Sequence, residues 1–107
     1  MLQILAALSA ALAIVAGAFG AHVFSGKEAE WLRTGGFYQL VHAVAVLALA
    51  RTAAPGVLWM LLGGATLFAA TLYAMALGAP RWLGAVTPVG GVLMIAGWLW
   101  VAWSLRQ

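Results

Sequence analysis

Long apolar runs separated by short polar or proline- and glycine-containing breaks dominate the chain. Leu2 to Phe24 contains no charged residue and, as a helix, would extend about 34 Å, enough to cross a hydrocarbon core of about 30 Å. The same pattern predicts three further spans, over residues 36–53, 57–78 and 83–105. We therefore expect an all-α protein whose single domain, residues 1–107, is a four-helix transmembrane bundle with antiparallel up-down topology.

The breaks between these runs carry most of the charge. Ser25 to Gly35 holds Lys27, Glu28, Glu30 and Arg33, which is typical of the membrane interface and predicts a turn or a short surface helix ending at Gly35 and Gly36. Pro55 and Pro80 mark the next two breaks. A cleaved signal peptide is the rival interpretation of the first run, but no Lys or Arg precedes it, so we expect it to be retained.

The composition supports membrane insertion and excludes a soluble enzyme or a nucleic-acid module. Hydrophobic residues make up 66% of the chain and charged residues 7%. The net charge is +3, but the five basic residues lie at the ends of apolar runs instead of forming a cluster, so no nucleic-acid partner is expected. The partners we expect are membrane lipids, other membrane proteins or a second copy of the chain. With no cysteine, the chain has no thiolate metal site.

An even number of spans places both termini on one side of the membrane. Trp59, Trp100 and Trp103 are expected at that interface, and the aromatic residues expected at the other are Phe24, Trp31, Phe37, Tyr38 and Trp82. Arg51 and Arg106 lie on the terminal side, against Lys27, Arg33 and Arg81 on the other. The charge count alone does not decide the orientation.

Small residues recur at four-residue spacing on two of the predicted helices. The first set is Ala13, Gly17 and Ala21, and the second is Thr66, Ala70, Ala74 and Gly78. Because lipid supplies no hydrophobic force between helices, small faces of this kind allow close backbone approach. Either both sets pack the helices of one subunit, or one of them is a contact face between subunits. The glycines that would also admit a neighbouring backbone, a ligand or a lipid are Gly17, Gly20, Gly90 and Gly91.

Two histidines are the main candidates for chemistry. His22 lies near the end of the first predicted span and His42 about two turns into the second, so antiparallel packing could bring them together. One hypothesis is a ligand site, in which the imidazoles hold a haem or a metal, or one of them contacts a quinone or a lipid headgroup. The alternative is that each neutral histidine hydrogen-bonds a neighbour and fixes packing. Because a third metal ligand is missing, we expect neither a metal nor a cofactor.

Other polar residues near the histidines complete the candidate site. Tyr38 precedes His42 by four residues and shares its helical face, with Gln39 adjacent. Pro88 would either start the fourth helix or kink it beside Gly90, where a cavity is best accommodated. A ligand would therefore be expected between the first, second and fourth helices, and the candidate residues are His22, Tyr38, Gln39, His42, Thr87 and Pro88. The alternative for this set is packing and interfacial anchoring.

Catalytic constellations are missing from the predicted spans. The two acidic residues, Glu28 and Glu30, lie in a predicted loop, whereas a proton-coupled exporter of the small multidrug-resistance type needs a carboxylate inside the membrane. We expect a protein that is not an enzyme and acts by packing against lipids or other membrane proteins, as a scaffold or an accessory subunit. The alternative is a small-ligand protein that uses His22 and His42.

Four segments together resemble a known family. They are GAFGAH (Gly17–His22), WLRTGGFYQLVHA (Trp31–Ala43), LFAATLYAMAL (Leu67–Leu77) and TPVGGVLMIAGW (Thr87–Trp98). They are similar to the signature segments of the YgdD/YwdK-like family, small four-helix proteins of the bacterial inner membrane that are classed as a domain of unknown function.

The resemblance implies a location and a set of marked positions. It implies the inner membrane, with both termini on the cytoplasmic side because relatives tend to carry basic residues there. The marked positions are Gly17, Gly20, His22, Tyr38, Gln39, His42, Tyr73, Thr87, Pro88, Gly90 and Gly91. Phe37 departs from the pattern, since relatives often carry a charge there, and so do Ala69, Ala70 and Thr71, where serine and glycine are usual. The family has no established activity, so the resemblance does not provide a mechanism.

Overall fold

Four long helices account for most of residues 1–106, the part of the chain that the computed structural model describes. They are α1 (Leu2–His22), α2 (Gly26–Leu49), α3 (Pro55–Ala76) and α4 (Thr87–Ser104), and a short 3₁₀-helix, η1 (Arg81–Ala85), precedes α4. Each is long and apolar enough to cross a membrane, with η1 and α4 forming one such segment. The expected all-α, four-helix transmembrane architecture is confirmed.

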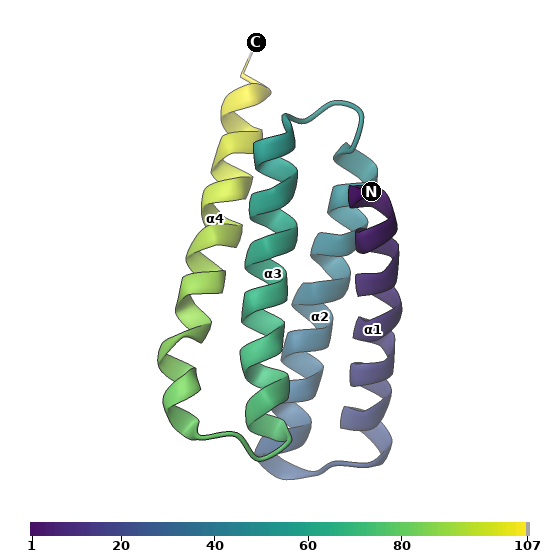
Figure 1. The fold of residues 1–107 in the computed structure, drawn as a ribbon, viewed down its shortest axis with the longest axis vertical. Coiled ribbons are helices and arrows are strands. Elements are labelled where there is room, and N and C mark those ends of the chain that lie inside the picture. Colours follow the sequence, from purple (N-terminus) through teal and green to yellow (C-terminus); the bar gives the residue numbers. More distant parts are fainter. Residues whose placement is uncertain (107) are drawn as a thin grey trace.

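Consecutive helices run antiparallel, so α1 begins and α4 ends at the same end of the bundle (Figure 1). We call this the terminal end; the α2–α3 loop also lies there. The opposite end, which holds the α1–α2 connection and η1, is called the loop end.

The helices pack in sequence order and leave the bundle open. α1 packs on α2, α2 on α3 and α3 on α4, and α1 also touches α3 lightly. Within residues 1–106, α1 and α4 do not contact each other. They therefore form the two edges of the bundle (Figure 1), and much of their surface faces lipid, whereas α3 is the most buried of the four.

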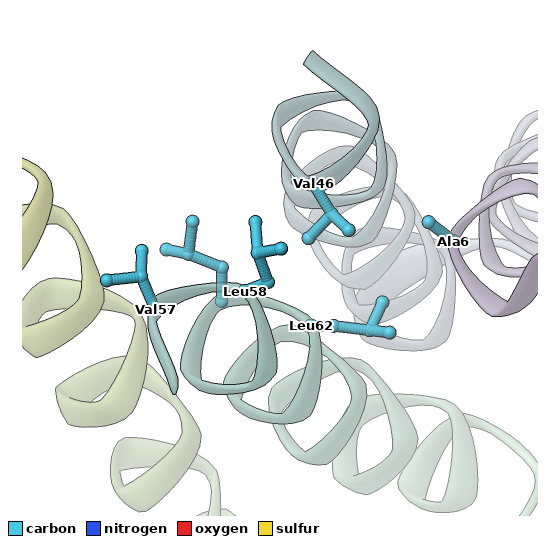
Figure 2. Packing of buried hydrophobic residues seen from close by; sticks show 6 residues of the cluster. Ala6, Val46, Val57, Leu58 and Leu62 are labelled. Carbon is cyan, nitrogen blue, oxygen red and sulfur yellow. The ribbon is translucent and has the colours of Figure 1, made fainter. Parts of the chain in front are cut away.

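A cluster of branched aliphatic side chains fills the terminal end. Val46 of α2 and Leu58, Leu61 and Leu62 of α3 pack together there, with Ala6 contributed by α1 (Figure 2). Three of the four buried residues of α1 are alanines and the fourth is Gly20. Since apolar side chains gain nothing by leaving lipid, small residues hold α1 by allowing close contact.

The segment expected to be a turn or a short surface helix ending at Gly35 and Gly36 is instead the first part of α2. Helix α2 begins at Gly26, ten residues before the expected start of the second span, and continues through Gly35 and Gly36, which are buried. A Cβ on Gly36 would lie 3.0 Å from the Ala13 carbonyl oxygen of α1, and one on Gly35 would lie 2.7 Å from the Tyr73 ring of α3. The glycine pair therefore admits close neighbours on both sides of α2. The helix continues because backbone groups in lipid need intrahelical hydrogen bonds.

This change in the start of α2 also moves two aromatic residues away from the expected interface. Phe37 and Tyr38 lie more than ten residues inside α2, in its middle turns.

At the beginning of the fourth span, residues 81–85 form η1, and α4 starts only at Thr87. Pro88 occupies the first turn of α4, where its missing N–H breaks no helical hydrogen bond, so it starts the helix instead of kinking it.

The two sets of small residues lie in different surroundings. Ala13 is buried and Gly17 lies against Gly36, so this part of the first set packs on α2, but Ala21 is exposed. In the second set, Thr66 and Ala70 are exposed. The buried face of α3 lies beside these two residues and includes Gly64, Ala65 and Ala69. Thr66 and Ala70 therefore remain open to a partner or to lipid.

Candidate functional site

A chain of hydrogen bonds connects three helices in the middle of the bundle. The side-chain amide nitrogen of Gln39, Nε2, donates to the Ser9 hydroxyl at 2.9 Å, and the Tyr73 hydroxyl donates to the side-chain amide oxygen of Gln39, Oε1, at 2.5 Å. Gln39 is buried, and these bonds link α2 to α1 on one side and to α3 on the other. A buried amide in lipid is stable only with such partners.

A lateral groove of about 630 Å³ opens beside this chain, between α1 and α3. Leu5, Leu8 and Leu12 form its α1 wall, and its α3 wall runs from Trp59 through Gly63 and Thr66 to Ala70. The serine, glutamine and threonine side chains at its surface are engaged, since Ser9 and Gln39 bond each other and the Thr66 hydroxyl donates to the Leu62 carbonyl of its own helix. The groove therefore offers an apolar surface.

A smaller cleft of about 300 Å³ lies between α2 and α4. Its polar centre is His42, which is buried. The Trp98 Nε1–H donates to Nε2 of His42 at 2.9 Å, and Nδ1 of His42 is 2.7 Å from the Tyr38 carbonyl oxygen. Because Nε2 accepts a hydrogen bond, Nδ1 carries the proton and donates it to the carbonyl, so both nitrogens of the neutral ring are occupied. The rings of Tyr38 and Phe68 close one side of the cleft.

The structure does not bring His22 and His42 together. His22 is exposed at the end of α1, and Gly20, one half-turn earlier, packs against Ala29 and Leu32 of α2. His42 lies 13 residues after Ala29 on α2, so about 20 Å of helix separates it from the level of His22. One haem iron cannot reach both imidazoles across that distance, so the geometry does not support the hypothesis of a site shared by the two histidines.

The remaining candidate residues also separate. Gln39 faces the α1–α3 groove, whereas Tyr38 and His42 line the α2–α4 cleft, so these neighbours in sequence do not form one cluster. The Thr87 hydroxyl lies 2.6 Å from that of Thr71 and ties α4 to α3. Pro88 is exposed, and helix α1 does not line the α2–α4 cleft.

Sequence reasoning missed three partners that define these contacts. Ser9 is an isolated polar residue in an apolar run, which is the only sign of its role in the sequence. Trp98 belongs to neither group of aromatic residues expected at the membrane interfaces. Thr71 stands out only as a departure from the family pattern. Each is paired with a residue at least 16 positions away, and such pairings cannot be read from one sequence.

The fold and these contacts define a small multi-pass membrane protein whose internal polar groups join its helices. The family model for a protein of unknown function (DUF423) matches residues 16–91, from the second half of α1 to the first turn of α4. The chain belongs to this family.

Curated relatives agree with this assignment. The UPF0382 inner membrane protein YgdD of Escherichia coli K12 is 42% identical over 89% of this chain and 81% of its own length. UPF0382 membrane proteins of Staphylococcus epidermidis RP62A and Haemophilus influenzae Rd are 38% and 36% identical, over 90% and 94% of this chain and 87% and 89% of their own lengths. The expected resemblance to YgdD-like proteins is confirmed. No solved structure matches the chain.

Proposed function

We propose that this protein is not an enzyme and acts through lateral contacts inside the inner membrane, with lipids and with other membrane proteins, as a scaffold or accessory subunit. The observation that carries the proposal is the open edge of the bundle: α1 does not meet α4 within residues 1–106, and an apolar groove is left between α1 and α3. A surface of this kind is complementary to apolar chains and helices in the bilayer.

The state of the polar groups supports the same conclusion. Among residues 1–106, every buried side-chain nitrogen or oxygen has a hydrogen-bond partner. Both nitrogens of His42 and both ends of the Gln39 amide are used to join helices or to bond their own backbone. A catalytic acid, base or nucleophile needs a group that can exchange its partner for a substrate. These groups instead stabilise the bundle.

The orientation proposed with this function places both termini in the cytoplasm. Arg51 and Arg106 lie at the terminal end, where Arg106 stacks on the Trp103 ring at 4.1 Å. Two basic residues at this end against three at the loop end do not decide the orientation, so the proposal rests on the resemblance to relatives that tend to carry basic residues on the terminal side.

Gentle extraction tests the proposed function. The protein is crosslinked in intact membranes and purified in a mild detergent, and its copurifying proteins and lipids are identified by mass spectrometry. We expect reproducible lipid, with or without a protein partner. Recovery of a lipid-free monomer with no crosslinked species would contradict the proposal.

A further inference from the structure

The α1–α3 groove runs along the membrane normal over the depth of one leaflet. Its α3 wall extends from Trp59, in the second turn of the helix, to Ala70. This stretch rises about 16 Å, close to half of a hydrocarbon core about 30 Å thick. Its α1 wall starts at Leu5, so the groove begins near the terminal end and stops near the middle of the bundle.

The surface of the groove is shaped for a flexible chain. A Cβ added to Gly63 would meet no neighbouring atom within 4 Å, and Thr66 and Ala70 are also exposed. Leucine side chains project from the opposite wall. Ser9, Gln39 and Thr66 already make hydrogen bonds within the protein, and the other lining residues are apolar or aromatic, so the groove suits an apolar chain better than a polar ligand.

The basic residue Arg51 lies at the end of the bundle where the groove begins. Arg51 is exposed in the α2–α3 loop, and its neighbours Leu49 and Ala53 pack on the same cluster as Leu2 of α1. The α2–α3 loop, which carries Arg51, lies at the terminal end beside the start of α1 (Figure 1), and this is the end at which the groove begins. Both acidic side chains of the chain, Glu28 and Glu30, are at the other end. A negatively charged headgroup at Arg51 is therefore not repelled by any acidic side chain of the protein.

From the length, the apolar lining and this charge, we propose that the α1–α3 groove binds one acyl chain of an anionic phospholipid, whose phosphate contacts Arg51. The inference rests on the proposed function and specifies its lipid partner. The lipid belongs to the leaflet at the terminal end.

The test compares lipid retention by variants in vesicles of equal parts phosphatidylglycerol and phosphatidylethanolamine, extracted in mild detergent and analysed by native mass spectrometry. Gly63→Leu fills the groove. Gly91→Leu is the matched control, because Gly91 also has nothing within 4 Å but lines the α2–α4 cleft. Ala70→Leu fills the inner end of the groove and serves if Gly63→Leu fails to fold, as judged by circular dichroism and gel filtration.

We expect the wild type and Gly91→Leu to retain phosphatidylglycerol and the groove-filling variants to lose it. Arg51→Gln should reduce the preference for phosphatidylglycerol about five-fold, the effect of one basic residue at an anionic surface. Equal retention by Gly63→Leu and Gly91→Leu, or an unchanged preference in Arg51→Gln, would overturn the inference while leaving the proposed function in place. A dimer that Gly63→Leu abolishes, without retained lipid, would also overturn it and assign the groove to a second copy. Absence of both lipid and partner from the wild type would instead refute the proposed function.

Discussion

At the scale of single residues, Gln39 joins more of the bundle than any other polar side chain described. Its amide bonds Ser9 of α1 and Tyr73 of α3, and its own helix is α2. Interhelical hydrogen bonds in membranes contribute about 0.6 kcal/mol each on average, less than an unsatisfied polar group in hydrocarbon would suggest. Their main effect is to fix which faces meet.

Replacing Gln39 with leucine should lower the free energy of unfolding by about 1 kcal/mol, because two interhelical bonds are lost. Tyr73→Phe should lower it by about half as much. In the Gln39→Leu background, Tyr73→Phe should have little further effect, because the amide oxygen that accepts the hydrogen bond from the Tyr73 hydroxyl is already gone. Unfolding by sodium dodecyl sulfate in mixed micelles, followed by circular dichroism, measures all of these values.

Thr66→Val is the control for this cycle, because its hydroxyl bonds only the Leu62 carbonyl of its own helix. It should leave stability nearly unchanged. Additive losses from Gln39→Leu and Tyr73→Phe would show that the two side chains are not coupled and that the hydrogen bond between them is absent in micelles.

At the scale of the helices, adjacent glycines on α4 have opposite surroundings. Gly90 is buried against α3, where an added Cβ would lie 2.6 Å from both the Gly64 oxygen and the Phe68 nitrogen. Those are backbone atoms, so only movement of a helix can relieve the clash. Gly91 has nothing within 4 Å. The sequence marks both positions equally, and the contact between α3 and α4 distinguishes them.

Gly90→Ala should therefore destabilise the protein by about 1–3 kcal/mol, the range for inserting a methyl group into a well-packed interior. Gly91→Ala should be neutral or slightly stabilising, because alanine favours a helix more than glycine does. The same detergent unfolding assay compares them. Similar losses for both variants would mean that α3 and α4 do not cross at Gly64 and Gly90.

At the scale of the whole molecule, the up-down order of the helices fixes which connections share a side of the membrane. The α2–α3 loop lies at the terminal end, whereas Ser25 and Ala79 lie at the loop end. The natural absence of cysteine means that single cysteines can report each position without background.

Thr52→Cys and Ser104→Cys should be labelled by a membrane-impermeant maleimide from one side of the membrane, and Ser25→Cys and Ala79→Cys from the other. Inverted and right-side-out vesicles provide the two sides. If both termini are cytoplasmic, as proposed, the first pair reacts only in inverted vesicles. Labelling of Thr52→Cys and Ser104→Cys from opposite sides would contradict the topology.

The sequence by itself determined the number of helices, their class and their up-down order. Apolar runs of bilayer length and their breaks depend only on local composition, because each span must satisfy its own backbone in lipid. The start of α2 was the main error. A glycine pair such as Gly35 and Gly36 is typical of a helix end. Only the close neighbours on both sides of α2 show that this pair serves helix packing.

The tertiary structure alone decided which polar residues meet and which faces stay open. Gln39 and Tyr38 are adjacent in sequence, yet they face different sides of α2, and the two histidines are separated by about 20 Å of helix. Ser9 and Trp98 complete the contacts from α1 and α4. These outcomes depend on the rotation and depth of each helix against its neighbours, which close packing of small residues sets and which no periodicity in a single helix contains.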